Sequence, residues 1–106
     1  MNLPRRLARL PRVNVRGLET AEIRLAHGPL ARLLGLAGLY AIPPNSGLLL
    51  PRTRSIHTCG MRFALDLVWL DRDGRIVRVD RGVRPWRLRG CRGARAVVEL
   101  PCAADA

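Results

Sequence analysis

The chain has 106 residues, the length of a single domain, and 48% of them are hydrophobic, as in ordinary globular proteins. Its formal net charge is +11, and all 19 basic residues are arginines scattered along the chain. The longest apolar run, residues 36–42, excludes a membrane-spanning helix, and we expect no secretory signal because no apolar stretch follows the basic N-terminus.

The N-terminal part of the chain predicts a basic arm followed by a hairpin. Residues 1–12 contain two prolines and four arginines without an acid, and we interpret them as a mobile basic N-terminal arm. Residues 13–16 and 21–26 have the composition of short strands, and residues 17–20 form the expected turn between them. The remainder, residues 13–106, is expected to form a single β-rich domain.

One short helix is predicted within residues 29–38. Pro29 suits the first helical turn, where its missing N–H is not needed, and Leu30, Leu33 and Leu34 recur at helical spacing. The glycines that follow favour an early end of this helix. Composition then predicts a loop over residues 43–47 and a short buried strand over residues 48–50.

The strongest strand signal lies within residues 55–73. Residues 55–59 are expected to be extended, with a bend at Gly60. Residues 65–70 are apolar on both faces except for Asp66, which is typical of a central strand.

Two further strands are expected towards the C-terminus. A turn at residues 71–74 predicts a hairpin into residues 75–80, with Val77 and Val79 facing inward. Residues 94–100 predict a last strand. Its two faces would carry Val98 and Leu100 on one side and Val97 and Glu99 on the other.

Short strands separated by Gly, Pro and Asp turns indicate an α+β, β-rich fold. We expect a twisted, mostly antiparallel sheet or a partly open small barrel with one short helix.

His57, Asp66 and Arg62 are the candidate catalytic residues. A histidine between apolar neighbours can act as a general base or metal ligand, or can be a structural imidazole bonded to the backbone. A carboxylate in a buried strand must accept hydrogen bonds, and we expect backbone N–H donors with help from Arg62 or Arg54. Strand alternation places His57 and Asp66 on opposite faces, so a dyad would need a bulge or a shifted register.

The three cysteines do not form a recognisable metal or redox motif. Cys59, Cys91 and Cys102 contain no C-x-x-C pair, so we expect no zinc site and no cofactor, and free thiols favour a cytoplasmic location. Cys59 shares a strand face with His57 and is either an activated nucleophile or, more simply, a small core side chain.

Several segments of residues 30–102 occur in an order and spacing that resemble the domain of unknown function 192 family of bacteria and archaea. They are Gly35-Leu36 after Arg32, Gly47-Leu48-Leu49, residues 56–66 (IHTCGMRFALD), residues 70–74 (LDRDG), residues 83–87 (VRPWR) and residues 96–100 (AVVEL). The resemblance implies a compact β-rich fold with one short helix and no established activity. Polar residues of these segments are the binding candidates: Thr58, Arg84, Trp86, Arg87 and Glu99.

Three functions remain open on this basis. The favoured interpretation is an uncharacterised soluble binding or accessory module, whose polar residues line a shallow pocket or hold the sheet together, with a small ligand or a protein as partner. The second is an enzyme that uses His57 and Asp66 at a shallow pocket, although no complete catalytic constellation is readable. The third is weak, sequence-independent nucleic-acid binding through arginine–phosphate contacts, without a specific nucleic-acid partner. Trp86, flanked by arginines, is expected to be exposed, as a lid over the sheet edge or as a stacking surface.

Overall fold

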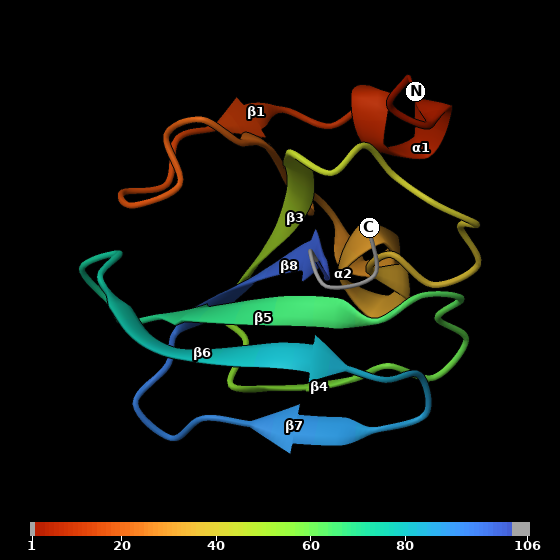
Figure 1. Ribbon diagram of the computed structural model, residues 1–106. Helices are drawn as coiled ribbons and strands as arrows, with labels where there is room; N and C mark the ends of the chain where they lie inside the picture. The colour runs from red at the N-terminus through yellow and green to blue at the C-terminus, as the bar shows by residue number, and fades with distance from the viewer. Residues whose placement is uncertain (1, 103–106) are drawn as a thin grey trace.

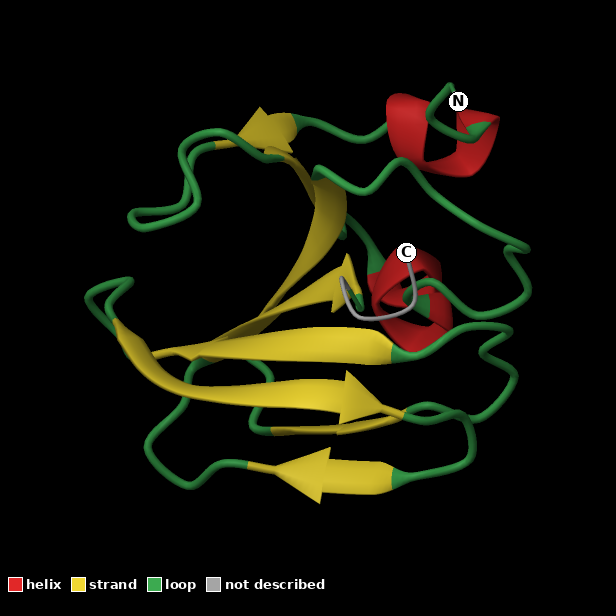
Figure 2. Cartoon of the chain, viewed as in Figure 1, coloured by secondary structure: helices red, strands yellow, loops and turns green. Residues whose placement is uncertain are grey.

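The chain folds into a mixed six-stranded sheet, a separate two-stranded sheet and two short helices, as seen in the computed structural model, which describes residues 2–102 (Figures 1 and 2). The elements are α1 (Arg5–Ala8), β1 (Arg12–Val13), β2 (Glu22–Leu25), α2 (Pro29–Leu34), β3 (Ser46–Pro51), β4 (Ser55–His57), β5 (Leu65–Leu70), β6 (Ile76–Val83), β7 (Leu88–Gly90) and β8 (Ala96–Pro101). The predicted β-rich fold is therefore confirmed. The sheet is not closed into a barrel, and a second helix is present.

The large sheet has the order β1-β2-β3-β8-β5-β6, so the last strand of the chain lies in its middle (Figure 1). Only the β2–β3 pair is parallel; the other pairs in this sheet are antiparallel. All six residues of β5 are buried, which confirms the predicted central strand. Side-chain alternation along β8 sends Val97 to the main core and Val98 to a second cluster on the opposite face.

The N-terminal segment is packed, unlike the mobile arm that the sequence predicts. Residues 5–8 form helix α1, and Leu7 is buried in the main core. Leu3 and Leu10 pack against the same cluster, so leucines at helical spacing outweigh the two flanking prolines. The predicted antiparallel pairing is present between β1 and β2, but residues 14–16 are not part of a strand, so the connection is longer than the predicted turn at residues 17–20.

The predicted short helix is present as α2, and it ends at Leu34 because Gly35 leaves the helical conformation with a φ of 53°. A positive φ of this kind strongly favours glycine. No residue of α2 is buried, and Leu30 and Leu33 are largely exposed. The helix therefore rests on the main core through Ala31, while the loop after it inserts the buried Leu36.

The β5–β6 hairpin forms as predicted, but its outer strand is more exposed than expected. Val77 and Val79 retain 45% and 38% of their accessible surface, so the prediction that they face inward is wrong. The reason is that β6 is the edge strand of the large sheet, so Val79 has a neighbouring strand on one side only, where it pairs with Val68. On its other face, Asp80 accepts a hydrogen bond of 3.0 Å from the indole N–H of the fully buried Trp69.

The two-stranded sheet of β4 and β7 contributes to the main core. Ile56 in β4 and Met61 after it belong to the same buried cluster as Leu67 and Trp69 of β5. The predicted extended segment after residue 54 is thus confirmed as β4, and the predicted bend follows at Gly60, which has a φ of 82°. Neither helix among residues 2–102 is long and apolar enough to cross a membrane.

Candidate functional site

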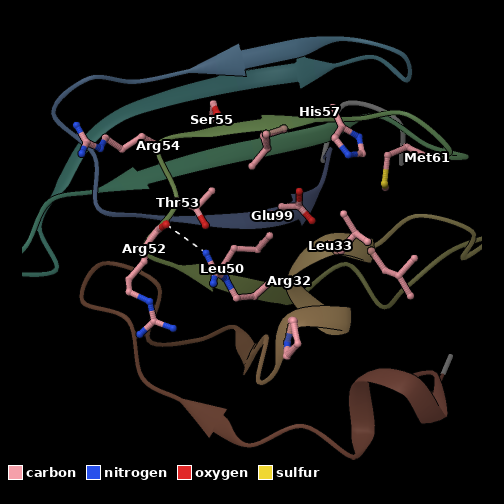
Figure 3. A pocket seen from close by; sticks show the side chains of 14 residues that line it. Arg32, Leu33, Leu50, Arg52, Thr53, Arg54, Ser55, His57, Met61 and Glu99 are labelled. Atoms are coloured by element: carbon pink, nitrogen blue, oxygen red, sulfur yellow. Dashed lines mark hydrogen bonds between the residues drawn. The ribbon is translucent and has the colours of Figure 1, made fainter.

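A pocket with a volume of about 430 Å³ lies between helix α2 and strand β4, above the middle of the large sheet (Figure 3). Both walls and the floor bring polar groups to it. The lining residues are Pro29, Arg32, Leu33, Leu34, Gly35, Leu50, Arg52, Thr53, Arg54, Ser55, Ile56, His57, Met61 and Glu99. Its size falls in the usual range for small-molecule sites.

Glu99 is the most unusual group of this pocket. It is in register with Leu48 of β3 and Leu67 of β5, so alternation turns its side chain onto the main-core face of the sheet. Only 3% of the residue is exposed. Its Oε1 atom is buried and has no hydrogen-bond partner within residues 2–102. Buried carboxylate oxygens are normally paired, so this one lacks the partner that its burial requires.

Burial raises the pKa of the Glu99 carboxyl to about 7, and the backbone N–H of Leu36 opposes this shift only in part. Removal from water disfavours the charged form of a carboxyl group, and no ion pair within residues 2–102 compensates for this at Glu99. A carboxyl group with a pKa near 7 can give up or accept a proton at neutral pH. The site therefore contains a group suited either to proton transfer or to binding a cationic or hydrogen-bonding ligand.

The loop after α2 closes one side of Glu99. A Cβ atom added at Gly35 would lie 2.8 Å from Glu99 Oε1, so glycine allows the backbone to approach the carboxyl group. Arg6 of α1 fixes this loop by donating hydrogen bonds to the carbonyl oxygens of Gly35, at 3.0 Å, and Ala37, at 2.8 Å. Helix α1 thus holds in place the loop that packs against Glu99.

Three arginines line the pocket: Arg32 from α2, and Arg52 and Arg54 from the segment that leads into β4. Arg32 donates one hydrogen bond of 3.3 Å to the carbonyl of Arg52, which Figure 3 shows as a dashed line, but its buried Nε has no partner within the described part of the chain. Glu99 is the one acid among the lining residues, so positive charge dominates the rim. Guanidinium groups in this arrangement favour an anionic ligand.

His57 lines the same pocket from the end of β4, and Figure 3 shows it on the wall opposite α2. Its Nδ1 accepts a hydrogen bond of 3.3 Å from the backbone N–H of Cys59, and the side chain is exposed. The sequence candidate His57 is therefore at the site, with its Nε2 free of protein hydrogen bonds in the described region.

Asp66 is not part of this pocket, and no hydrogen bond or ion pair within residues 2–102 joins it to His57. His57 lies in β4, which pairs with β7, and Asp66 lies in β5 of the large sheet, so the prediction that they occupy opposite faces of one strand pair is wrong. The dyad does not form among the described residues. Asp66 accepts a hydrogen bond of 2.9 Å from the backbone N–H of Gly82 and faces Arg81 at 3.6 Å. The predicted backbone donor is confirmed, whereas the assisting arginine is Arg81 and not Arg54 or Arg62.

Replacing Asp66 with alanine is expected to reduce the free energy of unfolding by about 1–3 kcal/mol, because the Gly82 N–H loses its acceptor. The Asp66→Asn variant keeps an acceptor oxygen and should lose less. Urea denaturation measures both values. Two unfolding curves identical to that of the wild type would show that this bond does not stabilise the fold.

Most of the other sequence candidates have structural or exposed positions away from the pocket. Thr58 is fully buried; its hydroxyl donates to the Arg84 carbonyl and accepts from the Arg87 N–H, each at 2.7 Å. Arg62 lies over the ring of Tyr40, 4.4 Å from its centroid. Trp86 is 68% exposed, as predicted. Arg84, Arg87 and Cys59 are also exposed.

Of the predicted binding residues, only Glu99 lines the pocket, and the arginines beside it were not predicted. The signal for Glu99 was an acid inside an apolar strand. Arg32 and Arg52 carry no comparable signal, since each is one of many arginines in a basic chain. A second pocket of about 530 Å³ is lined by Asp71 and Asp73, and Asp71 already accepts hydrogen bonds from the N–H groups of Asp73 and Arg75.

Comparison with known proteins identifies the family. The model of domain of unknown function 192, described as uncharacterized ACR, COG1430, matches residues 12–104, so the chain belongs to this family. No curated protein matches.

Two solved structures are similar in fold. A protein of unknown function from Novosphingobium aromaticivorans DSM 12444 has a TM-score of 0.70 at 16% identity, over 79% of this chain and 65% of that one. This chain thus spans about two thirds of that protein's length. A "putative transcription regulator" from Sinorhizobium meliloti 1021 has a TM-score of 0.69 at 24% identity, over 77% of this chain and 69% of that one. At these identities the likeness shows the fold alone.

Proposed function

We propose that this protein is a small-molecule binding module whose ligand carries an anionic group and occupies the pocket between α2 and β4. The observation that carries the proposal is the buried, unpartnered Oε1 of Glu99 at the floor of an arginine-lined pocket. A buried carboxylate without a partner destabilises a fold, and a protein keeps such a group where function needs it.

The polar groups of the pocket are suited to hold a ligand at two ends. Arg32, Arg52 and Arg54 provide donors for an anionic group, and Glu99 provides an acceptor deeper in the pocket. Arg32, Gly35, His57 and Glu99 also belong to the segments through which the chain resembles its family. We further propose a cytoplasmic location, which is supported by three cysteines that are all free of disulfides.

Thermal melting in the presence of small carboxylates, phosphate and phosphate monoesters tests the proposal. At least one compound should raise the melting temperature, because a ligand that binds only the folded state stabilises it. Isothermal titration of that compound should show binding at least ~10-fold weaker for Arg32→Gln, since a charged hydrogen bond contributes about 1.4 kcal/mol or more.

Arg75→Gln is the matched control, because Arg75 is exposed and lies outside the pocket. It removes the same charge and should leave the affinity unchanged at constant ionic strength. Equal weakening by both variants would assign the binding to net charge alone. If no compound of the panel raised the melting temperature, the result would contradict the proposed function.

A further inference from the structure

We infer that the ligand of this pocket is a zwitterion, an aliphatic α-amino acid whose ammonium group contacts Glu99 and whose carboxylate contacts the arginines. The inference rests on the proposed function and specifies its ligand class. It starts from the way in which the pocket keeps its opposite charges apart.

The pocket contains both signs of charge without pairing them. The ion pairs within residues 2–102 join Arg12 and Arg24 to Glu22, Arg78 to Asp80, and Arg81 to Asp66. None of them involves Glu99 or a pocket arginine. The carboxylate and the guanidinium groups are therefore unpaired across the same space. A molecule with one positive and one negative end can satisfy both.

The unpartnered atoms match the two ends of an amino acid. Glu99 Oε1 is an acceptor, and a primary ammonium group offers it a positive charge and N–H donors. Arg32 Nε is a buried donor without a partner, and a carboxylate offers it oxygen atoms. A neutral hydroxyl would satisfy Glu99 only by one hydrogen bond and would leave its charge uncompensated.

The apolar part of the lining favours an aliphatic side chain. Leu33, Leu50, Ile56 and Met61 contribute to the walls between the charged groups. Met61 and Ile56 belong to the main core and Leu33 is exposed, so the apolar surface extends from the interior to the pocket mouth. A branched aliphatic group would bury apolar surface there. The volume of about 430 Å³ accommodates a single amino acid.

Isothermal titration calorimetry with leucine, N-acetylleucine and leucinamide tests the inference. N-Acetylleucine keeps the carboxylate and lacks the ammonium group, whereas leucinamide keeps the ammonium group and lacks the carboxylate. We expect leucine to bind at least ~10-fold more tightly than either analogue, the factor that corresponds to loss of one charged contact.

The variant Glu99→Gln separates the role of the carboxylate from that of the fold. It should reduce leucine affinity to the level of N-acetylleucine while leaving N-acetylleucine binding unchanged. Leucine binding by the wild type should also strengthen as the pH rises from 6 to 8, because the ammonium group requires ionised Glu99, whose pKa is about 7.

The outcomes distinguish this inference from the proposed function. If N-acetylleucine binds as tightly as leucine, the inference of a zwitterionic ligand is wrong, whereas the proposal of a ligand with an anionic group stands. If none of the three compounds binds, while phosphate or another anion of the panel does, the inference also fails and the proposed function stands. Unchanged leucine affinity in Glu99→Gln would likewise overturn it.

Discussion

Replacing Glu99 with glutamine is expected to stabilise this protein at pH 8 by about 3 kcal/mol. Burial raises the pKa of Glu99 from its ordinary value of 4.5 to about 7. Each pKa unit corresponds to about 1.4 kcal/mol of free energy of unfolding. The rise in the pKa of Glu99, multiplied by this value, gives the amount by which the ionised carboxylate destabilises the fold at pH 8. Glutamine has nearly the same shape and never ionises. Urea denaturation of both proteins at pH 8 measures the difference.

The size of this effect depends on pH over a defined window. A carboxyl group whose pKa is higher in the folded state binds a proton more tightly there, so it contributes stability below pH 4.5. That contribution is lost between pH 4.5 and about 7, and it is absent above pH 7. The difference in free energy of unfolding between Glu99→Gln and the wild type should therefore grow from pH 4.5 to about pH 7 and stay constant above pH 7.

Glu22→Gln is a suitable control because it removes the same charge from a surface ion pair with Arg24. Surface pairs contribute about 0–1 kcal/mol, so this variant should differ little from the wild type at either pH. The account of Glu99 would fail if Glu99→Gln were less stable than the wild type at pH 8. Such a result would mean that the carboxylate is paired in the folded protein.

The second large effect is expected at Thr58, which sequence analysis proposed as a binding residue. Thr58→Val should lower the free energy of unfolding by about 2–4 kcal/mol. The substitution preserves the shape but leaves two backbone groups without their partner, the Arg84 carbonyl and the Arg87 N–H. Because Thr58 has no exposed surface, water cannot replace the hydroxyl without a rearrangement.

Thr58→Ser is the control for this prediction, since it keeps the hydroxyl and loses one methyl group, at a cost of about 1 kcal/mol. Thermal melting compares the two variants, and hydrogen exchange at the Arg87 amide should accelerate only in Thr58→Val. A binding role would give the reverse pattern, with wild-type melting in both variants and reduced affinity for the pocket ligand.

The sequence predicted the elements that local patterns determine. The β5–β6 hairpin follows from an apolar run, an Asp-rich turn and a glycine with positive φ at Gly74. Helix α2 follows from Pro29 and leucine spacing. The packing of α1 was missed because the two prolines argue against a helix there, and because the burial of Leu7 depends on a core formed by distant residues.

The candidate site was predicted only in part, for a related reason. Glu99 and Asp66 are both acids within apolar strands, and the sequence favoured Asp66 because its neighbours are more apolar. The two carboxyl groups differ in their hydrogen-bond partners because each strand pairs with residues that are distant in the sequence. Asp66 meets the Gly82 N–H, whereas Glu99 lies between β3 and β5 under the loop after α2, where the described residues offer no donor to its Oε1. The order of strands in the sheet decides which acid remains available.

The central claim is that Glu99 is a buried carboxyl group left unpaired for a ligand, and a pH titration of its carboxyl carbon by NMR tests this most directly. The resonance is assigned by its loss in Glu99→Gln. The account predicts a midpoint of about 7 in the absence of ligand. A midpoint at or below 4.5 would show a solvated or ion-paired carboxylate and would contradict it.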